Sequence, residues 1–291
     1  MYQVDCVLDA RAALGECPRW DATSKRLYWV DIARQELHRF DPATGTDEKR
    51  TFDQPVGCFA VRAKGGFVLA MRDGFWLLDE WEGTPRPVEP QVEAHLPENR
   101  FNDGRCDAQG RFWAGTMDGT KKAANGTLWR LDPDLSLHRC ASGTLTSNGL
   151  AFAPDGRTMY WSDTPNHIVR AYGLDPDTGA LGAPRTFATF AWARGRPDGA
   201  AVDSEGCYWS ALYDGGRVVR LSPEGRLLAE VAIPSRHCTM IAFGGEDLRT
   251  AYVTTAAQGL DAEELARRPR SGGLFAFRVD VPGLPEHRFG G

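Results

Sequence analysis

Four oxygen-bearing side chains recur along the sequence in similar local settings and could together bind a metal ion. Each of them is followed within two residues by a Gly or a Pro, and they are Glu16, Asn102, Asn148 and Asp198. Carboxylate and amide oxygens are hard ligands that suit Ca²⁺, Mg²⁺ or Mn²⁺, with Fe²⁺ and Zn²⁺ as further candidates. These residue types therefore indicate a site for one divalent ion, provided that the fold brings them together.

Other kinds of catalytic centre lack support in the sequence. It contains no H-E-x-x-H motif, no G-x-S-x-G nucleophile turn and no phosphate-binding P-loop, so serine-hydrolase and nucleotide chemistry are not indicated. The seven cysteines are an odd set without a C-x-x-C pair, and we expect most of them to be small buried side chains. A reactive thiol is considered only at Cys238, where His237 is adjacent in the sequence.

The elements that would position these residues form an internal repeat. The units 149–179 and 199–225 share the same order of short apolar or β-branched runs, bounded by Asp-Gly, Glu-Gly or Asp-Pro turns. This pattern is typical of consecutive antiparallel strands. Four further units match this pattern, and they begin near Pro18, Phe59, Gly104 and Thr239. The chain therefore contains six units.

The spacing of the units predicts a six-bladed β-propeller of four-stranded antiparallel blades. The first hairpin turns follow one another at intervals of 39 to 50 residues, a typical blade length, and fall at Ser24, Gly65, Gly110, Gly156, Gly206 and Gly245. A β-sandwich is the alternative, but a sandwich has no reason to repeat a four-strand unit six times. We expect an all-β protein whose residues 1–291 form one domain. Residues 4–8 would complete the last blade, and residues 261–268 would form a short helix.

The repeat places the candidate ligands at equivalent points of the blades. Counting back eight residues from each hairpin turn gives Glu16, Gly57, Asn102, Asn148, Asp198 and His237. Because equivalent positions of a propeller face equivalent places, we expect these side chains at one end of the central channel. The alternative is a set of independent turns, since Asn-Gly and Asp-Gly are common turn pairs. Their position ahead of the first strand favours a shared site.

Composition and charge exclude several other classes of protein. Hydrophobic residues make up 42% and charged residues 25% of the 291 residues, as in ordinary globular proteins. The 34 Lys and Arg residues are outnumbered by 39 Asp and Glu residues and form no long basic run, so no nucleic-acid partner is expected. No window approaches about 18 apolar residues, and no secretory leader is recognisable, so we expect a cytoplasmic protein without a membrane partner.

Six short motifs occur in order along nearly the whole chain. They are Leu14-Gly-Glu-Cys-Pro18 with Trp20, Arg100-Phe-Asn-Asp-Gly104, Gly115-Thr-Met117, Ser147-Asn-Gly149, Pro197-Asp-Gly199 and Gly272-Gly-Leu-Phe275. Together they resemble the senescence-marker-protein (regucalcin)/gluconolactonase family of sugar lactonases. The resemblance implies a hydrolase that uses one divalent metal ion to open a small sugar lactone to the aldonic acid.

The resemblance also implies roles for individual residues. Glu16, Asn148 and Asp198 would hold the metal ion, for which Ca²⁺ is the first choice and Zn²⁺, Mg²⁺, Mn²⁺ or Fe²⁺ are the alternatives. Asp198 is in addition our candidate for the catalytic residue that activates water. Arg100 and Asn102 would bind the hydroxyl and ring oxygens of the substrate, with Asp103 close by. The alternative role of Arg100 and Asn102 is to join neighbouring blades.

One segment departs from the family pattern. Many relatives carry acidic residues soon after the Gly-Thr-Met strand, whereas this chain reads Asp118-Gly-Thr-Lys-Lys122. We therefore expect a different loop over the site, and the identity of the lactone stays open. The other hypotheses are a non-enzymatic calcium-binding regulatory propeller, a metal-dependent esterase or phosphotriesterase, and a propeller that binds proteins. The cluster of Arg100, Asn102 and Asp103 favours a polyhydroxylated substrate over an apolar one.

Overall fold

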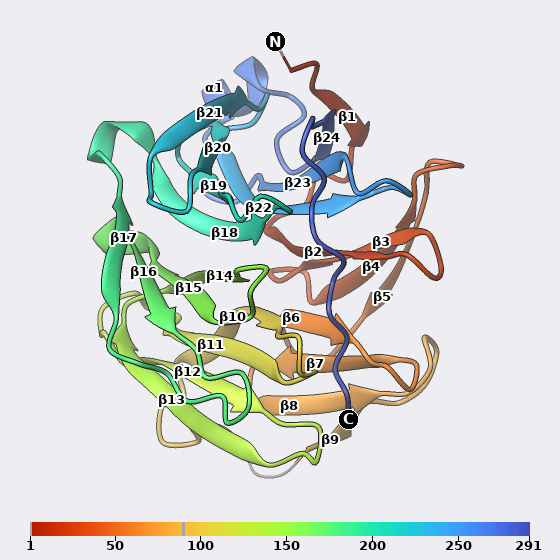
Figure 1. The fold of residues 1–291 in the computed structure, drawn as a ribbon. Helices are drawn as coiled ribbons and strands as arrows, with labels where there is room; N and C mark the ends of the chain where they lie inside the picture. The colour runs from red at the N-terminus through yellow and green to blue at the C-terminus, as the bar shows by residue number, and fades with distance from the viewer. Residues whose placement is uncertain (1, 89–90) are drawn as a thin grey trace.

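Six four-stranded antiparallel sheets surround a central axis in the computed structural model, which describes residues 2–88 and 91–291 (Figure 1). The first three sheets contain β2 (Gly15–Asp21), β3 (Arg26–Asp31), β4 (Glu36–Asp41) and β5 (Thr46–Thr51), then β6 (Val56–Val61), β7 (Phe67–Met71), β8 (Gly74–Leu78) and β9 (Arg86–Pro87), then β10 (Asn99–Cys106), β11 (Phe112–Asp118), β12 (Gly126–Leu131) and β13 (Leu137–Thr144). The next two contain β14 (Ser147–Phe152), β15 (Thr158–Asp163), β16 (Ile168–Gly173) and β17 (Arg185–Thr189), then β18 (Arg196–Val202), β19 (Tyr208–Tyr213), β20 (Arg217–Leu221) and β21 (Leu227–Ala232). The predicted six-bladed β-propeller is confirmed.

The sixth sheet joins the two ends of the chain. Its strands, in spatial order, are β1 (Asp5–Leu8), β24 (Leu274–Arg278), β23 (Thr250–Ala256) and β22 (His237–Gly244). Cys6 of β1 lies opposite Phe275 of β24 in an antiparallel pair. A strand from the start of the chain therefore closes the ring, as predicted for residues 4–8.

The helical content is small and includes the predicted helix. Helix α1 (Ala262–Arg267) lies between β23 and β24. The Asp261 carboxylate caps it by accepting a hydrogen bond of 2.8 Å from the backbone N–H of Glu264, which satisfies a donor that the first helical turn leaves free. Two short 3₁₀ turns are η1 (Thr164–Asn166) and η2 (Trp192–Arg194). Within the described residues, no helix is both long and apolar enough to cross a membrane.

Burial decreases from the channel to the rim of each sheet. The innermost strands β14 and β22 are buried throughout, whereas the outermost strands β5 and β13 are largely exposed. Strand β5 reads Thr-Asp-Glu-Lys-Arg-Thr, and its charged side chains need contact with water. The residues that each blade presents to the channel are therefore held between buried strands.

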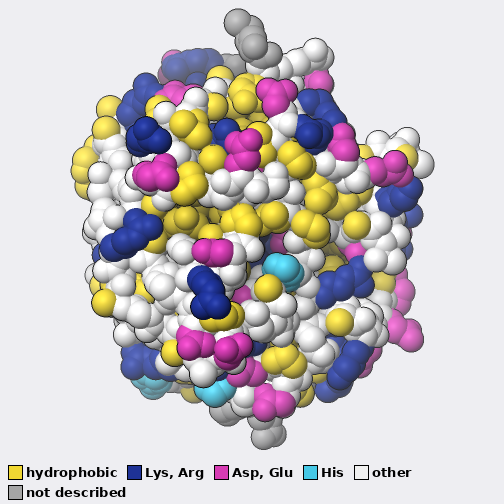
Figure 2. Space-filling view, viewed as in Figure 1, with side chains coloured by type: hydrophobic (Ala, Val, Ile, Leu, Met, Phe, Trp, Pro, Cys, Tyr) yellow, Lys and Arg dark blue, Asp and Glu magenta, His cyan; other side chains and the backbone are white. Residues whose placement is uncertain are grey.

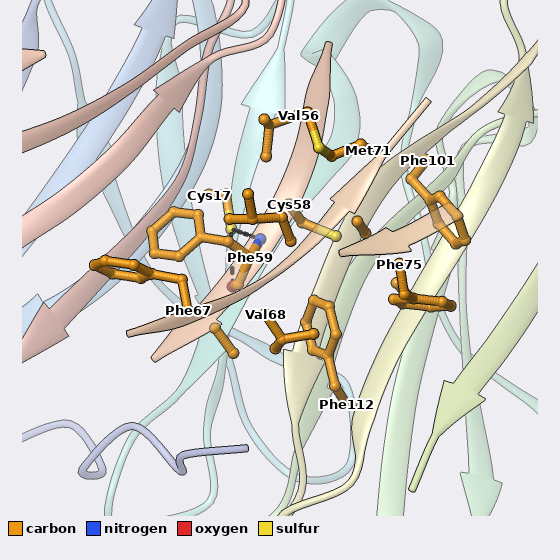
Figure 3. Close-up of a cluster of buried hydrophobic side chains, with 14 of the residues drawn as sticks. Cys17, Val56, Cys58, Phe59, Phe67, Val68, Met71, Phe75, Phe101 and Phe112 are labelled. Carbon is orange, nitrogen blue, oxygen red and sulfur yellow. Dashed lines mark hydrogen bonds between the residues drawn. The ribbon is translucent and has the colours of Figure 1, made fainter. Parts of the chain in front are cut away.

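Aromatic side chains fill the space between neighbouring sheets. In the cluster drawn in Figure 3, Phe59, Phe67 and Phe112 pack beside the small side chains of Cys17 and Cys58. Four tryptophans in the second strands of their blades are at most 2% exposed, and they are Trp29, Trp113, Trp161 and Trp209. Because interiors of this kind are close-packed, the blades are fixed relative to one another, and so are the loops at the channel ends.

The last residues of the chain cross one face of the propeller (Figure 1). The backbone N–H of Ser204 donates to the carbonyl of Pro282, and that of Gly290 donates to the carbonyl of Gly110. Both contacts lie at first-hairpin turns, so this segment covers the turn end of the innermost strands. On this face, basic and acidic side chains are interspersed, as Figure 2 shows.

Candidate active site and metal centre

The candidate ligands lie at a repeated irregularity of the innermost strands. In each of these strands the pairing register with the second strand of the blade shifts, as it does at a β-bulge. In the four strands that carry the candidate residues, the shifts occur at positions 16–19, 101–104, 148–151 and 197–200. A bulge redirects a side chain from the regular alternation of a strand. Next to Glu16 and Asn148, Cys17 and Gly149 adopt positive φ angles of 50° and 59°. The equivalence predicted from the repeat therefore has a structural basis.

One cavity of about 440 Å³ brings the predicted residues together. It lies where the innermost strands begin, at the end opposite the hairpin turns, and Glu16, Asn102, Asn148 and Asp198 all line it. Each of these four side chains belongs to a residue that is at most 7% exposed. Arg100 lines the same cavity. The gathering at one channel end that the repeat predicted is thus observed for Glu16, Asn102, Asn148 and Asp198, and Arg100 lies with them.

A chain of side-chain hydrogen bonds links three blades across this cavity. Arg100 Nη1 donates to Asn102 Oδ1 at 2.7 Å, and Asn102 Nδ2 donates to Asn148 Oδ1 at 2.9 Å. Asn148 Nδ2 in turn donates to Thr164 Oγ1 at 2.8 Å, whose hydroxyl donates to the Pro197 carbonyl at 2.8 Å. An amide oxygen has two lone pairs, so Asn148 Oδ1 retains one for an additional ligand.

The two carboxylates of the cavity resist ionisation. Burial raises the pKa of Glu16 well above its usual range, and the negative charges of Asp198 and Asp103 raise it further. Burial and the charge of Asp103 also raise the pKa of Asp198 well above its usual range, while the charges of Arg196 and Lys121 oppose this shift. A cation placed between two such carboxylates would favour their charged forms.

The donor set fits a hard divalent ion. Asp198 Oδ1 is buried and has no hydrogen-bond partner among the described residues, and an unpaired buried oxygen of this kind is costly unless something binds it. Glu16 and Asn148 supply further oxygens on the same cavity wall. In residues 2–88 and 91–291, no three His, Cys, Asp or Glu side chains are grouped so as to hold a metal. The predicted ligand set contains only two such side chains, Glu16 and Asp198, because its third member, Asn148, is an amide.

Asp103 is placed differently from its neighbours. It is buried, and it is not one of the residues that line the cavity. Asp103 Oδ2 accepts a hydrogen bond of 2.8 Å from the backbone N–H of Leu150, which ties β10 to β14. Burial raises the pKa of Asp103, and the charge of Arg19 opposes this rise. Asp103 therefore acts on the cavity mainly through its charge.

The remaining two blades contribute no ligand at the equivalent position. A Cβ on Gly57 would overlap the backbone of Phe101, so close packing of two innermost strands requires glycine there. The His237 ring stacks on Tyr213 with 4.2 Å between centroids, and its Nε2 lies 3.0 Å from Asp214 Oδ1. His237 thus lies behind the Tyr213 side chain that lines the cavity.

Cys238 is not paired with the neighbouring imidazole. Its Sγ donates to the carbonyl of Ser235 at 3.6 Å, whereas His237 faces Asp214. Burial raises the pKa of the Cys238 thiol, which disfavours the reactive thiolate. The arrangement therefore gives no support to a catalytic thiol at this position.

Several residues of the cavity wall were not found from the repeat. Burial and the charge of Asp198 raise the pKa of Tyr213 to about 12, so this wall residue stays a neutral hydroxyl. The others that the structure adds include Lys121, Thr164 and Arg196. Most of them follow the second strand of a blade, where the sequence shows no common residue type. Of these three, Lys121 alone had a signal, because it lies in the segment that departs from the family pattern.

Three comparisons relate this chain to known proteins. The family model of the SMP-30/Gluconolactonase/LRE-like region matches residues 14–257. A 6-deoxy-6-sulfogluconolactonase from Pseudomonas putida is 47% identical over 294 residues, covering 98% of each chain. Regucalcin from Xenopus laevis is 36% identical over 296 residues, covering 99% of each chain.

A solved structure shows that the likeness extends to the fold. The crystal structure of a calcium-binding protein, regucalcin, from Agrobacterium tumefaciens superposes with a TM-score of 0.94 at 28% identity. The superposition covers 99% of this chain and 97% of the other. With its ordered motifs, its six blades and these matches over most of its length, the chain belongs to the SMP-30/gluconolactonase/LRE-like family.

Proposed function

We propose that this protein is a divalent-metal-dependent sugar lactonase that opens an aldonolactone to the aldonic acid. The observation that carries the proposal is the cavity in which two buried carboxylates, Glu16 and Asp198, meet the amides Asn102 and Asn148 and the guanidinium of Arg100. Such a wall offers oxygens to a cation and hydrogen-bond donors to a polyhydroxylated molecule. Names of relatives add support, because the Pseudomonas putida protein is named as a lactonase.

The chemistry can be divided among the residues of the wall. Glu16, Asn148 and Asp198 would hold the ion, which when bound would polarise the lactone carbonyl and lower the pKa of a water molecule. Asp198, either as a ligand shared with the water or after partial release of the ion, would accept the proton of the attacking water. The water oxygen would bond to the carbonyl carbon, the ring C–O bond would break, and the ring oxygen would take the proton held by Asp198 and leave as a hydroxyl.

Arg100 and Asn102 orient the substrate in this scheme. The Nη1 of Arg100 is already bonded to Asn102 Oδ1 and to the carbonyl of Phe101, which fixes the plane of the guanidinium. Its other nitrogens remain as donors to hydroxyl or ring oxygens. Correct positioning of the lactone can contribute several kcal/mol to the rate.

Removal and restoration of the ion tests the proposal. Chelated protein should release no acid from a panel of aldonolactones in a pH-indicator assay, and Ca²⁺, Zn²⁺, Mg²⁺ or Mn²⁺ added singly should restore turnover. Full activity in protein shown to be metal-free would contradict the mechanism. Glu16→Ala and Asp198→Ala should abolish both ion binding, measured by calorimetry, and turnover.

A non-enzymatic calcium-binding propeller is the second candidate function. The Agrobacterium tumefaciens structure is described as that of a calcium-binding protein. The same assay separates the two functions, because a regulatory protein would bind Ca²⁺ without hydrolysing any aldonolactone in the panel.

A further inference from the structure

The cavity wall carries more positive charge than the candidate ion site requires. Its basic residues are Arg100, Lys121 and Arg196, and Arg196 forms an ion pair with Asp214. The two carboxylates of the wall would be balanced by one divalent ion. Among residues 2–88 and 91–291, no carboxylate oxygen lies within 4.0 Å of the charged nitrogens of Arg100 or Lys121. In the described part of the chain, two cations therefore line the cavity without a carboxylate in direct contact.

Lys121 is held at the cavity by an ordered turn that follows β11. The Asp118 carboxylate accepts hydrogen bonds from the backbone N–H groups of Thr120 at 2.8 Å, Lys122 at 3.0 Å and Ala123 at 2.9 Å. Lys121 adopts a φ of 58°, and its N–H donates to the Asp118 carbonyl at 2.9 Å. A left-handed backbone at a non-glycine residue persists only where surrounding contacts maintain it. The turn thus presents Lys121 to the cavity. Both Lys121 and Lys122 are exposed to solvent, but only Lys121 lines the cavity wall.

The two cations share one side of the cavity. Arg100 lies in β10 and Lys121 follows β11, so both belong to the third sheet. The candidate ion ligands Glu16, Asn148 and Asp198 lie in β2, β14 and β18 of three other sheets. The volume of about 440 Å³ is within the range of small-molecule sites. A lactone whose carbonyl faces the candidate ligands can therefore extend its other end toward the third sheet.

We propose that the substrate is an aldonolactone with an anionic group at the end remote from its carbonyl, and that Lys121 selects this group. The inference rests on the proposed lactonase function and adds the charge of the substrate to it. A sulfonate, a phosphate or a carboxylate on the exocyclic carbon shares the required chemistry, which is a charged oxygen that accepts from the ammonium group. A neutral lactone would leave both cations without an anionic group in direct contact.

Selectivity between matched lactones tests this inference. We would measure kcat/KM of the ion-loaded enzyme for glucono-1,5-lactone, its 6-phosphate and its 6-deoxy-6-sulfonate. The wild type should prefer the anionic lactones by about tenfold or more, the effect of one charge-assisted hydrogen bond. Lys121→Gln should lower the ratio of anionic to neutral kcat/KM by a similar factor, and Lys121→Arg should retain most of it. Lys122→Gln, the matched control, should leave the ratio unchanged.

Ionic strength provides a second readout that a purely structural role would not change. Salt screens the attraction between charges, so the ratio should fall with added salt in the wild type and much less in Lys121→Gln. The preferred anionic group, phosphate or sulfonate, is the one whose lactone has the larger kcat/KM relative to the neutral lactone. Equal kcat/KM for neutral and anionic lactones in the wild type, or equal losses in Lys121→Gln and Lys122→Gln, would overturn the inference and leave the lactonase function standing. Hydrolysis of none of the lactones would instead contradict the proposed function itself.

Discussion

Asp198 and Glu16 are buried carboxylates that the folded protein holds against their preference for water. Burial and the charge of Asp103 raise the pKa of Asp198. Burial and the charges of Asp198 and Asp103 raise the pKa of Glu16. The unfolded chain releases these protons near pH 4, whereas the ion-free folded protein keeps them at higher pH. Because the unfolded state then binds fewer protons, the free energy of unfolding falls as pH rises above about 4.

Asp198→Asn should therefore stabilise the ion-free protein and abolish its response to the ion. In chelator at pH 7, we expect the free energy of unfolding to rise by about 1 kcal/mol or more, because the amide requires neither a buried charge nor the uptake of a proton on folding. A divalent ion at about one hundred times its Kd should stabilise the wild type by about 2.7 kcal/mol and the variant not at all. Urea unfolding with and without the ion measures both effects.

Asp214→Asn is the control with the opposite sign. The hydrogen bond with His237 and the charge of Arg196 lower the pKa of Asp214 to about 2, so its charge stabilises the fold at neutral pH. This stability is present above about pH 4 and is lost as pH falls toward 2. Asp214→Asn should destabilise the ion-free protein at pH 7. A destabilised Asp198→Asn under the same conditions would show that burial and the charge of Asp103 do not disfavour the ionised carboxylate in the folded protein.

Arg100→Ala should separate substrate binding from ion binding. The side chain touches Asn102 and Phe101, and no candidate ion ligand is a direct partner. Each lost charge-assisted hydrogen bond is worth roughly 1.5–3 kcal/mol, or about a tenfold to hundredfold fall in kcat/KM. The loss should be large for polyhydroxylated lactones and small for butyrolactone, while calorimetry should show unchanged ion affinity. Equal losses on both substrates would mean that Arg100 acts on the reacting carbonyl or on the structure.

At the scale of the element, the bulge in four of the innermost strands aims a candidate ligand at the cavity. Gly149 follows Asn148 at a φ of 59°, and a Cβ there would overlap the Tyr208 hydroxyl and lie 2.6 Å from Ser162 Oγ. Gly156 has a similar φ of 64°, but a Cβ would meet nothing within 4 Å. The two glycines therefore differ in packing and not in backbone conformation.

Gly149→Ala should weaken ion binding as well as stability. Both Gly149→Ala and Gly156→Ala incur the left-handed penalty of about 1–2 kcal/mol, and Gly149→Ala should lose roughly a further 1–3 kcal/mol from overpacking. Only Gly149→Ala should lower ion affinity, because its strand must shift beside Asn148. Unfolding curves and ion titrations of the two variants check this, and equal ion affinities would count against the role of the bulge.

At the scale of the whole molecule, the ring is completed by both ends of the chain. Strand β1 pairs with β24, and Phe289 near the C-terminus is fully buried and forms backbone hydrogen bonds with Val61 and Ala63. Glu286 from the same segment lies 3.4 Å from Arg105 and 4.0 Å from Arg19. Glu286 thereby supplies a counter-charge to two buried guanidinium groups from two different blades.

Glu286→Gln should destabilise the propeller much more than removal of an exposed acid. Removing one partner of a buried ion pair leaves the other charge uncompensated, and we expect a loss of about 2 kcal/mol or more. In the control pair, Lys25 and Glu246 are 65% and 80% exposed, so Glu246→Gln should change stability little. Thermal unfolding of both variants is the measurement. Similar melting temperatures for the two would show that the C-terminal segment adds no electrostatic stability.

The sequence by itself determined the architecture and the position within each repeat at which the candidate site residues lie. Hairpin turns, strand patterns and unit length are local properties that recur six times, so the propeller, strand 4–8 and the helix near Asp261 could all be predicted. Glu16, Asn102, Asn148 and Asp198 occupy the same position in their repeats, which predicted that they would line one cavity. The symmetry of the propeller places equivalent residues of different repeats close together in space.

Only the tertiary structure decided where individual side chains point and which distant groups meet. Asp103 is adjacent to Asn102 in sequence, yet its carboxylate accepts a hydrogen bond from the backbone N–H of Leu150 in the next blade, and the bulge between Phe101 and Gly104 sets the direction of both side chains. Lys121 enters the cavity wall through a turn held by Asp118, and Glu286 meets Arg105 across the channel. These contacts depend on loop conformation and on packing between blades, which are non-local and leave no periodic trace in the sequence.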